Sequence, residues 1–162
     1  MKATKGRHIP LVPGAKAPAF ELARDGGGTV SLTDFAGRKL ALFFFPRAGS
    51  AGCTQEAIGF SVLAAGFAEV DTAVLGVSPD AVETVERFKT RHALSIPLAC
   101  DPDHRTLSAY GVWGEKSLYG KSFMGVIRTT FLIDQTGRIT RIWPKVKIKG
   151  HAEAVLAAAR DL

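Results

Sequence analysis

The chain has 162 residues, of which 46% are hydrophobic and 22% charged, as in an ordinary globular protein with enough residues for one sizeable core. We expect residues 1–162 to form a single domain in which residues 1–16 are an extended arm that packs loosely. The formal net charge is +6, with the basic residues spread along the chain except in this arm and at Lys145, Lys147 and Lys149. No aromatic–basic interleaving accompanies them, so we interpret the charge as a solvated surface and expect no specific nucleic-acid partner.

The N-terminus and the cysteines favour a reducing compartment. The basic N-terminus leads into no apolar signal-peptide run, and the longest apolar run is far too short to cross a membrane. Cys53 and Cys100 lie far apart, without a C-x-x-C motif or metal-ligand spacing to any histidine. We therefore expect a cytoplasmic protein with no membrane partner, no disulfide scaffold and no metal.

The first part of the chain predicts a β-hairpin. Ala17–Leu22 has the composition of a short strand, and the turn residues Asp25–Gly28 lead into a second strand at Thr29–Leu32. Ser31 or Thr33 is then expected to cap a short helical turn.

Two βα units follow the hairpin. Leu40–Phe45 is a continuous apolar run, typical of a buried parallel strand, and helical spacing of apolar residues comes directly after it. Ala73–Val77 predicts the next buried strand, with Ser78 as the N-cap of a helix over 79–92. A short strand at Ile96–Cys100 completes the pattern. Right-handed crossovers and a parallel sheet core are expected.

The C-terminal part predicts a second hairpin and a last helix. Asp103–Tyr110 favours a short helix, and Trp113–Lys121 is rich in glycine and aromatic residues, which indicates a functional loop. Strands are expected at Val126–Ile133 and Arg138–Trp143, joined by the turn Asp134–Gly137. The last helix has an inner stripe of Ala152, Val155, Leu156 and Ala159. This order predicts an α/β fold, a mixed central sheet with helices on both faces and an N-terminal β-hairpin extension.

One stretch has the features of an active-site loop. The strand ending at Phe45 breaks at Pro46 into small residues that place Cys53 in the first turn of a helix. Unpaired backbone N–H groups and the positive end of the helix dipole favour a thiolate there. Position alone leaves two interpretations for Cys53, a reactive nucleophile or a small buried hydrophobic residue.

The pattern Pro46-x-x-x-Ser50-x-x-Cys53 resembles the active-site signature P-x-x-x-[ST]-x-x-C of the peroxiredoxins, in the AhpC/TSA superfamily. The stretches Gly111–Lys121 and Gly125–Asp134 resemble the peroxiredoxin Q, or bacterioferritin-comigratory, subfamily, and the likeness covers nearly the whole chain. The resemblance implies a thioredoxin-like fold and a peroxidase that needs no metal or organic cofactor. It would reduce hydrogen peroxide and organic hydroperoxides.

The resemblance also assigns roles to residues of this chain. It implies that Cys53 is the peroxidatic cysteine, that Ser50 and Arg128 complete the site, that Pro46 shields it, and that Glu56 holds the arginine. The sulfenic acid formed on the cysteine would be reduced by an external thiol such as thioredoxin, glutaredoxin or glutathione. A monomer or weak dimer is expected.

Two positions depart from the subfamily pattern. Ile58 stands where many members carry a resolving cysteine, and the loop reads Ser50-Ala51-Gly52 where Thr-Pro-Gly is commoner. Cys100 is the remaining candidate for a resolving thiol, but two or three strand spacings of about 4.8 Å exceed the ~7 Å that a disulfide tolerates. We therefore favour a one-cysteine cycle over a Cys53–Cys100 two-cysteine cycle.

Other functions fit less well. A disulfide reductase on this fold needs the C-x-x-C motif that the chain lacks. The alternative of another class is a non-catalytic holdase or nucleic-acid-binding protein that uses the positive charge. Trp113 and Tyr119 either line the mouth of the site or pack beneath the loop that carries them.

Overall fold

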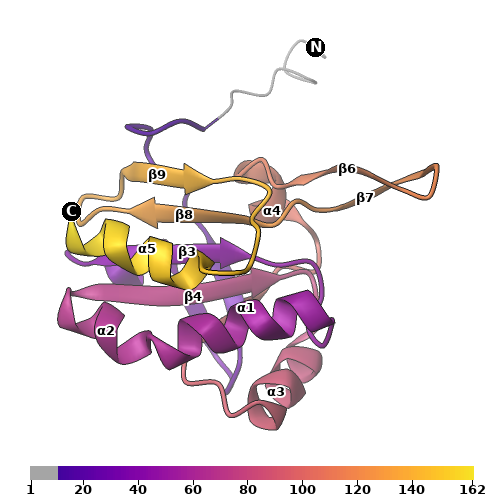
Figure 1. Cartoon of the computed structure of the whole chain (residues 1–162), viewed down its shortest axis with the longest axis horizontal. Coiled ribbons are helices and arrows are strands. Elements are labelled where there is room, and N and C mark those ends of the chain that lie inside the picture. The colour runs from indigo at the N-terminus through magenta and orange to yellow at the C-terminus, as the bar shows by residue number, and fades with distance from the viewer. Residues whose placement is uncertain (1–10) are drawn as a thin grey trace.

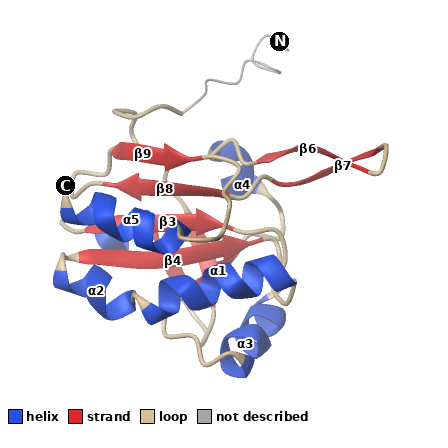
Figure 2. Ribbon diagram, in the orientation of Figure 1, coloured by secondary structure: helices blue, strands red, loops and turns tan. Residues whose placement is uncertain are grey.

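In the computed structural model, which describes residues 11–162, a seven-stranded mixed sheet is covered by helices on both faces (Figure 1). The strand order is β2-β1-β5-β4-β3-β8-β9, and β6 pairs with β7 in a separate hairpin that projects from the body (Figure 2). The strands are β1 (Glu21–Arg24), β2 (Thr29–Ser31), β3 (Lys39–Phe44), β4 (Thr72–Ser78), β5 (Leu98–Cys100), β6 (Trp113–Leu118), β7 (Lys121–Val126), β8 (Thr129–Ile133) and β9 (Ile139–Trp143). The helices are η1 (Leu32–Phe35, a 3-10 helix), α1 (Ala51–Val62), α2 (Ala64–Glu69), α3 (Val82–Arg91), α4 (Arg105–Ala109) and α5 (His151–Arg160).

The sheet separates two hydrophobic clusters. Along β3, Ala41 and Phe43 face the cluster covered by α1, α2, α3 and α5, whereas Leu42 and Phe44 face the cluster covered by η1 and α4. Every residue of β3 is buried because this central strand is covered on both faces. β3 runs parallel to β4, β4 runs parallel to β5, and β8 is antiparallel to β3.

Most predicted elements are confirmed to within a few residues. The N-terminal hairpin, the parallel strands of the core, the turn at Asp134–Gly137 and the buried stripe of the last helix are all present. Ser31 caps the 3-10 helix in a reciprocal pair with Asp34. The predicted α/β class with a mixed sheet is therefore confirmed.

The predicted loop at Trp113–Lys121 is wrong. These residues form most of an antiparallel hairpin, with Leu118 paired to Lys121. The turn between them is made by Tyr119 and Gly120, both with positive φ, 53° and 78°. Two consecutive left-handed residues suit a tight hairpin turn, but the usual sequence signal is Asn-Gly or Asp-Gly, so Tyr-Gly did not indicate it.

Three predicted boundaries are also wrong. The expected strand 126–133 is two strands, interrupted at Ile127 and Arg128, where the projecting hairpin joins the main sheet. The strand expected at 17–22 is instead β1, farther along the chain. The helix expected over 79–92 begins only at Val82, because Ser78 ends β4 and bonds to Asp80 instead of capping a helix.

The expected loose arm is only partly within the described residues, since 1–10 lie outside them. Residues 11–16 do not pack loosely: Gly14 N donates to Ile139 O at 2.7 Å, and Ala15 O accepts from Ile139 N at 2.8 Å. Leu11 packs against the hydrophobic cluster beneath. Backbone pairing with β9 therefore holds this segment against the sheet. Within residues 11–162, no helix is long and apolar enough to span a bilayer.

Candidate active site

The loop between β3 and α1 places Cys53 at the third position of the helix. Ser50 is the N-cap, and its Oγ accepts the backbone N–H of Cys53 at 3.4 Å. Gly49 has φ 92°, a conformation that favours glycine, so the small residue is needed for the loop to turn into the helix. Cys53 itself is fully buried, with no exposed surface.

Arg128 connects the cysteine to a buried carboxylate. It lies in the two-residue link between β7 and β8, and its Nη2 donates to Cys53 Sγ at 3.4 Å while Nη1 donates to Glu56 Oε1 at 2.7 Å. The planar guanidinium can hold both partners at once, which an ammonium on a flexible stem could not do in the same fixed geometry. Cys53 and Glu56 are one helical turn apart on α1 and face the same arginine.

Burial sets the protonation of Glu56. Removal from water raises the pKa of this carboxyl to about 7, although Arg128 pulls it down. Glu56 Oε2 has no hydrogen-bond partner among the described residues. Burial also opposes the charge on Arg128, but Cys53 and Glu56 outweigh it, and the arginine pKa is raised. The arginine is therefore a permanent cation beside the sulfur.

The other two residues predicted for the site, Ser50 and Pro46, lie in the loop between β3 and α1. Ser50 Oγ donates to Arg47 O at 3.1 Å, so its hydrogen is engaged within the loop and its remaining lone pair can accept. Pro46 is half-buried just beyond the end of β3. Cys53, Ser50, Arg128 and Glu56 are thus brought together by one loop, one helix and one strand junction.

Cys100 is not brought into this group. It ends β5, which is separated from β3 by β4, and both cysteines are free and buried. Burial, with the nearby carboxylates, raises the pKa of its thiol to about 12. A thiol held in its protonated form is a poor nucleophile.

Two supporting residues were missed by sequence reasoning. Asp80 Oδ2 accepts the backbone N–H of Ala48 at 2.7 Å and so anchors the loop before Cys53. Asp80 follows β4, the parallel neighbour of β3, so the rule that parallel strands end at one edge could have indicated it. Ile148 covers Gly52: its Cδ1 lies 3.0 Å from the position that a Cβ on Gly52 would occupy. No local pattern marks Ile148, because it comes from the loop between β9 and α5.

A buried histidine lies close enough to Arg128 to be affected by its charge. His151 Nε2 and Thr130 Oγ1 are 2.8 Å apart, and the imidazole packs edge-on against Phe60 and Trp143. Burial, followed by the charge of Arg128, lowers the pKa of His151 to about 4. The imidazole is therefore neutral near pH 7 and adds no second positive charge to the site.

The fold and the site together define a class: thioredoxin-like α/β proteins with a cysteine at a helix N-terminus beside an arginine. The chain matches the AhpC/TSA family over residues 13–142. It is 42% identical to peroxiredoxin Bcp of Bacillus subtilis over 149 residues, which cover 92% of this chain and 95% of that protein. The chain belongs to the AhpC/TSA family, among its peroxiredoxins of the Bcp and peroxiredoxin Q type.

Solved structures agree with this placement. Peroxiredoxin Q of Xanthomonas campestris superposes with a TM-score of 0.85 at 35% identity, covering 94% of this chain and 96% of that one. PrxQ of Xylella fastidiosa gives a TM-score of 0.89 at 31% identity, covering 95% and 98%. The expected thioredoxin-like fold is thus confirmed.

Proposed function

We propose that Cys53 is the peroxidatic cysteine of this chain and that Ser50, Arg128 and Pro46 complete its site, with Glu56 in support. Membership of the peroxiredoxins makes the chain a thiol-dependent peroxidase rather than the non-catalytic alternative. The observation that carries the residue assignment is the contact of 3.4 Å between Arg128 Nη2 and Cys53 Sγ at the start of a helix. A buried structural cysteine has no need of a guanidinium partner.

In the first half of the cycle, the thiolate of Cys53 attacks one oxygen of the hydroperoxide. An S–O bond forms, the O–O bond breaks, and the other oxygen leaves as hydroxide or alkoxide, which takes up a proton to give water or an alcohol. The cysteine becomes a sulfenic acid. In the bacterioferritin comigratory protein of X. campestris, 35% identical to this chain, structures have been used to study alkyl peroxide reduction activity, which supports the same substrate class here.

Thiolate formation alone is too small an effect to explain catalysis. An ordinary thiol is already a few per cent ionised at pH 7, so complete ionisation raises the reactive fraction by about 30-fold at most. Enzymes accelerate reactions by about 10⁶-fold or more. The larger share must come from contacts that orient the peroxide and stabilise the charge growing on its leaving oxygen.

The geometry assigns these contacts to two side chains. Because the Ser50 hydroxyl donates to Arg47 O, its free lone pair is suited to accept the peroxide O–H and hold the molecule in line. Arg128 is suited to stabilise the leaving oxygen, since its cation already lies beside the sulfur. No cofactor takes part in this scheme.

In the second half, an external thiol returns the sulfenic acid to the thiol. One donor thiol forms a mixed disulfide with Cys53 and releases water, and a second donor thiol displaces Cys53, so that the donor leaves as a disulfide. We propose a one-cysteine cycle with thioredoxin, glutaredoxin or a small thiol as donor. The buried, protonated Cys100 supports it. Two free cysteines also suit the cytoplasm, and we propose a monomer or weak dimer there.

The test is peroxide consumption with dithiothreitol as the only reductant. We expect wild type to consume both hydrogen peroxide and an alkyl hydroperoxide, and Cys53→Ser to be inactive but folded, because a serine hydroxyl is essentially un-ionised near pH 7. One equivalent of peroxide should add the mass of one oxygen atom to wild type and none to the variant. A folded Cys53→Ser protein that still turns over peroxide would refute the assignment.

A further inference from the structure

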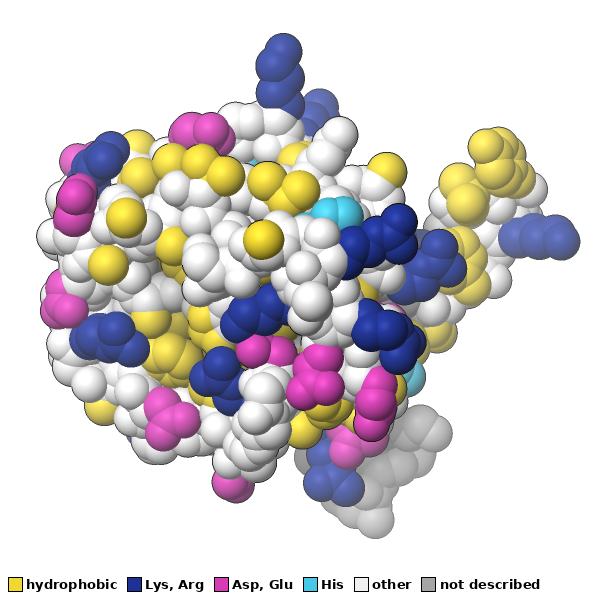
Figure 3. All heavy atoms as spheres, turned by 90° about the horizontal axis from the view of Figure 1, so that it is seen from below, with side chains coloured by type: hydrophobic (Ala, Val, Ile, Leu, Met, Phe, Trp, Pro, Cys, Tyr) yellow, Lys and Arg dark blue, Asp and Glu magenta, His cyan; other side chains and the backbone are white. Residues whose placement is uncertain are grey.

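The projecting hairpin exposes large apolar side chains that the enzyme reaction does not use. At its tip and along β7, Leu118, Tyr119, Phe123 and Met124 have 57%, 95%, 46% and 52% of their surface exposed. In the space-filling view, hydrophobic side chains gather on the hairpin that protrudes from the body, with Lys and Arg side chains between the two (Figure 3). A cluster of exposed large apolar residues on a two-stranded hairpin indicates a contact surface.

A basic segment lies beside the hairpin. We call residues 144–150, between β9 and α5, the strap. Its lysines, Lys145, Lys147 and Lys149, are exposed, whereas Val146 and Ile148 between them are half-buried. The alternation turns the apolar side chains inward and leaves the positive charges in solvent.

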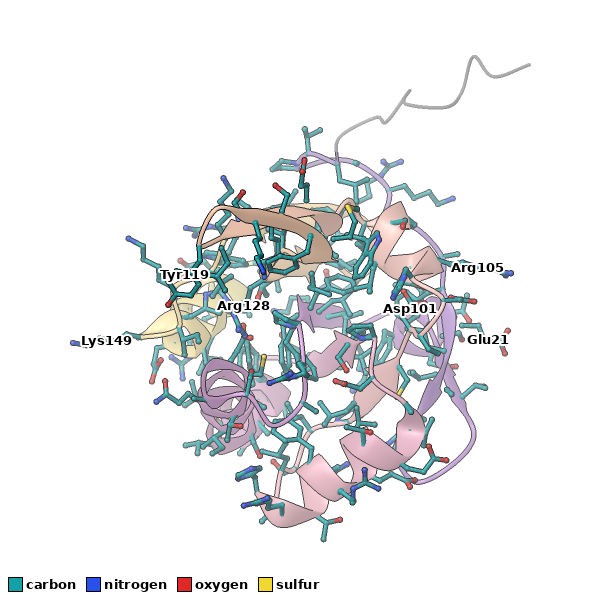
Figure 4. All side chains as sticks on the ribbon, turned by 90° about the vertical axis from the view of Figure 1, so that its right-hand side faces the viewer. Glu21, Asp101, Arg105, Tyr119, Arg128 and Lys149 are labelled. Carbon is teal, nitrogen blue, oxygen red and sulfur yellow. The ribbon has the colours of Figure 1, made fainter. Side chains whose placement is uncertain are left out.

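The strap and the hairpin meet at the active site. Val146 N donates to Arg128 O at 2.9 Å, and Arg128 follows β7 by two residues. Ile148 and the Arg128 guanidinium both lie over Gly52, directly before the buried cysteine. Figure 4, which faces the side from which the hairpin projects, shows Tyr119, Arg128 and Lys149 on the same side of the molecule.

The charge of this combined surface is strongly positive. Residues 113–126 and the strap contain five lysines and one acidic residue, Glu115. The neighbouring acidic group on α5 is Glu153, in its first turn. An apolar centre with a positively charged rim fits a protein whose own contact surface has an apolar centre and an acidic rim.

We propose that the hairpin tip (residues 118–124) and the strap form the docking face for an acidic protein dithiol, the electron donor that reduces the Cys53 sulfenic acid. This inference rests on the proposed function and names the surface for its second half-reaction. A donor must bring a thiol to the buried sulfur of Cys53, and the strap borders that position because Ile148 lies over Gly52, directly before the cysteine. A second copy of the chain fits less well, because a two-fold contact through the strap would place lysines against lysines.

The experiment compares two reductants on the same variants. The donors are a thioredoxin of net negative charge, kept reduced by its NADPH-dependent reductase, and dithiothreitol. Lys147→Glu/Lys149→Glu and Leu118→Ser are the docking variants. Lys16→Glu/Arg105→Glu and Val62→Ser are the matched controls, because these residues are also exposed but lie outside the face, with Val62 73% exposed.

We expect kcat/KM for thioredoxin to fall at least fivefold in the docking variants, mainly because KM rises. In wild type, kcat/KM for thioredoxin should fall as the salt concentration is raised. Dithiothreitol-driven turnover should stay within twofold, and both controls should match wild type with either donor. Unchanged thioredoxin kinetics in both docking variants would overturn the proposal, and so would an equal loss with both donors. If the docking variants keep their thioredoxin kinetics and lose only the binding of phosphatidylglycerol vesicles, the face binds a lipid surface instead of a protein.

The dithiothreitol arm separates this inference from the proposed function. Wild type that fails with dithiothreitol contradicts the peroxidase assignment and the inference with it. Wild type that works with dithiothreitol, together with docking variants that retain full thioredoxin turnover, contradicts the docking face alone.

Discussion

At the scale of single residues, the site depends on one guanidinium that serves two acceptors. Arg128 bonds to Cys53 Sγ and Glu56 Oε1 from different nitrogens, so its position is determined by α1 on one side and by the β7–β8 junction on the other. Each residue has an ordinary alternative role, since arginines often extend from strands and carboxylates often pair on surfaces. The burial of the arginine and the carboxylate together, with the cysteine sulfur on the same guanidinium, makes the group specific.

Loss of the Arg128 charge should be costly for catalysis. We expect Arg128→Met to lower kcat/KM by about 10²- to 10³-fold, typical of removing one preorganised donor. Arg128→Lys should recover only part of this loss, because a point charge cannot hold both partners in a fixed fork. Single-turnover kinetics with hydrogen peroxide measures the effect. The double variant Arg128→Met/Glu56→Gln is the control, because Arg128→Met alone leaves the buried Glu56 carboxyl without its partner. Wild-type rates in Arg128→Met would remove the arginine from the mechanism.

Glu56 should make folding stability depend on pH. Its pKa is raised in the folded protein, from 4.5 to about 7, so the unfolded chain ionises first as pH rises and stability falls between these values. Relative to Glu56→Gln, wild type should lose on the order of 3 kcal/mol across this window and change little above it. Urea unfolding of both proteins between pH 4.5 and 8 measures the difference. A difference that is constant with pH would mean that Glu56 is ionised throughout.

At the scale of elements, close packing between the central strands positions the loop that carries Cys53. Gly76 on β4 lies opposite Phe43 on β3, and a Cβ at Gly76 would come within 2.6 Å of Phe43 Cζ and 2.9 Å of Leu98 Cδ2. Phe43 in turn stacks on Phe60 of α1, with ring centroids 4.5 Å apart. The helix that carries Cys53 thus packs on β3 through Phe60 and Phe43, and the place of Phe43 requires a glycine at position 76.

We expect Gly76→Ala to destabilise the protein by about 1–3 kcal/mol, because the added methyl group overpacks the core. Gly59→Ala is the matched control: it lies inside α1, where its Cβ would meet Ala152 at an ordinary 3.5 Å. That variant should gain about 0.5–1 kcal/mol from helix propensity. Denaturant unfolding compares the two. Equal stabilities would show that β3 and β4 separate easily, against the packing described here.

At the scale of the whole molecule, the sheet order keeps the two cysteines apart. Cys100 ends β5 and the Cys53 loop follows β3, with β4 between them, a separation of roughly 10 Å across the sheet. A disulfide tolerates about 7 Å between Cα atoms. Bridging would require the start of α1 to unwind.

Cys100→Ser should therefore leave dithiothreitol-dependent turnover almost unchanged, and the oxidised wild type should carry a sulfenic acid that dimedone traps. Peptide mapping after one equivalent of peroxide provides the check. A Cys53–Cys100 disulfide in that map, together with loss of turnover in Cys100→Ser, would establish a two-cysteine cycle instead.

The sequence by itself determined the parts that depend on local signals. The apolar run of β3, the helical spacing after Cys53 and the glycine in the turn at 134–137 are written in neighbouring residues, so their elements were predicted correctly. The pattern of Pro46, Ser50 and Cys53 likewise lies within one short stretch. It was sufficient to indicate the chemistry.

Only the tertiary structure decided which distant residues complete the site and its surroundings. Asp80, Ile148 and His151 all lie far from Cys53 in the sequence, and although the strand before Asp80 hinted at its place, no local pattern marked Ile148 beside the loop or His151 near Arg128. The hairpin of β6 and β7 was mistaken for a loop because its turn relies on Tyr119 in a left-handed conformation that tyrosine rarely adopts. Local sequence patterns indicate the backbone conformation of an element and the spacing of its buried residues. Which remote segments cover Cys53 depends instead on the order of the strands in the sheet.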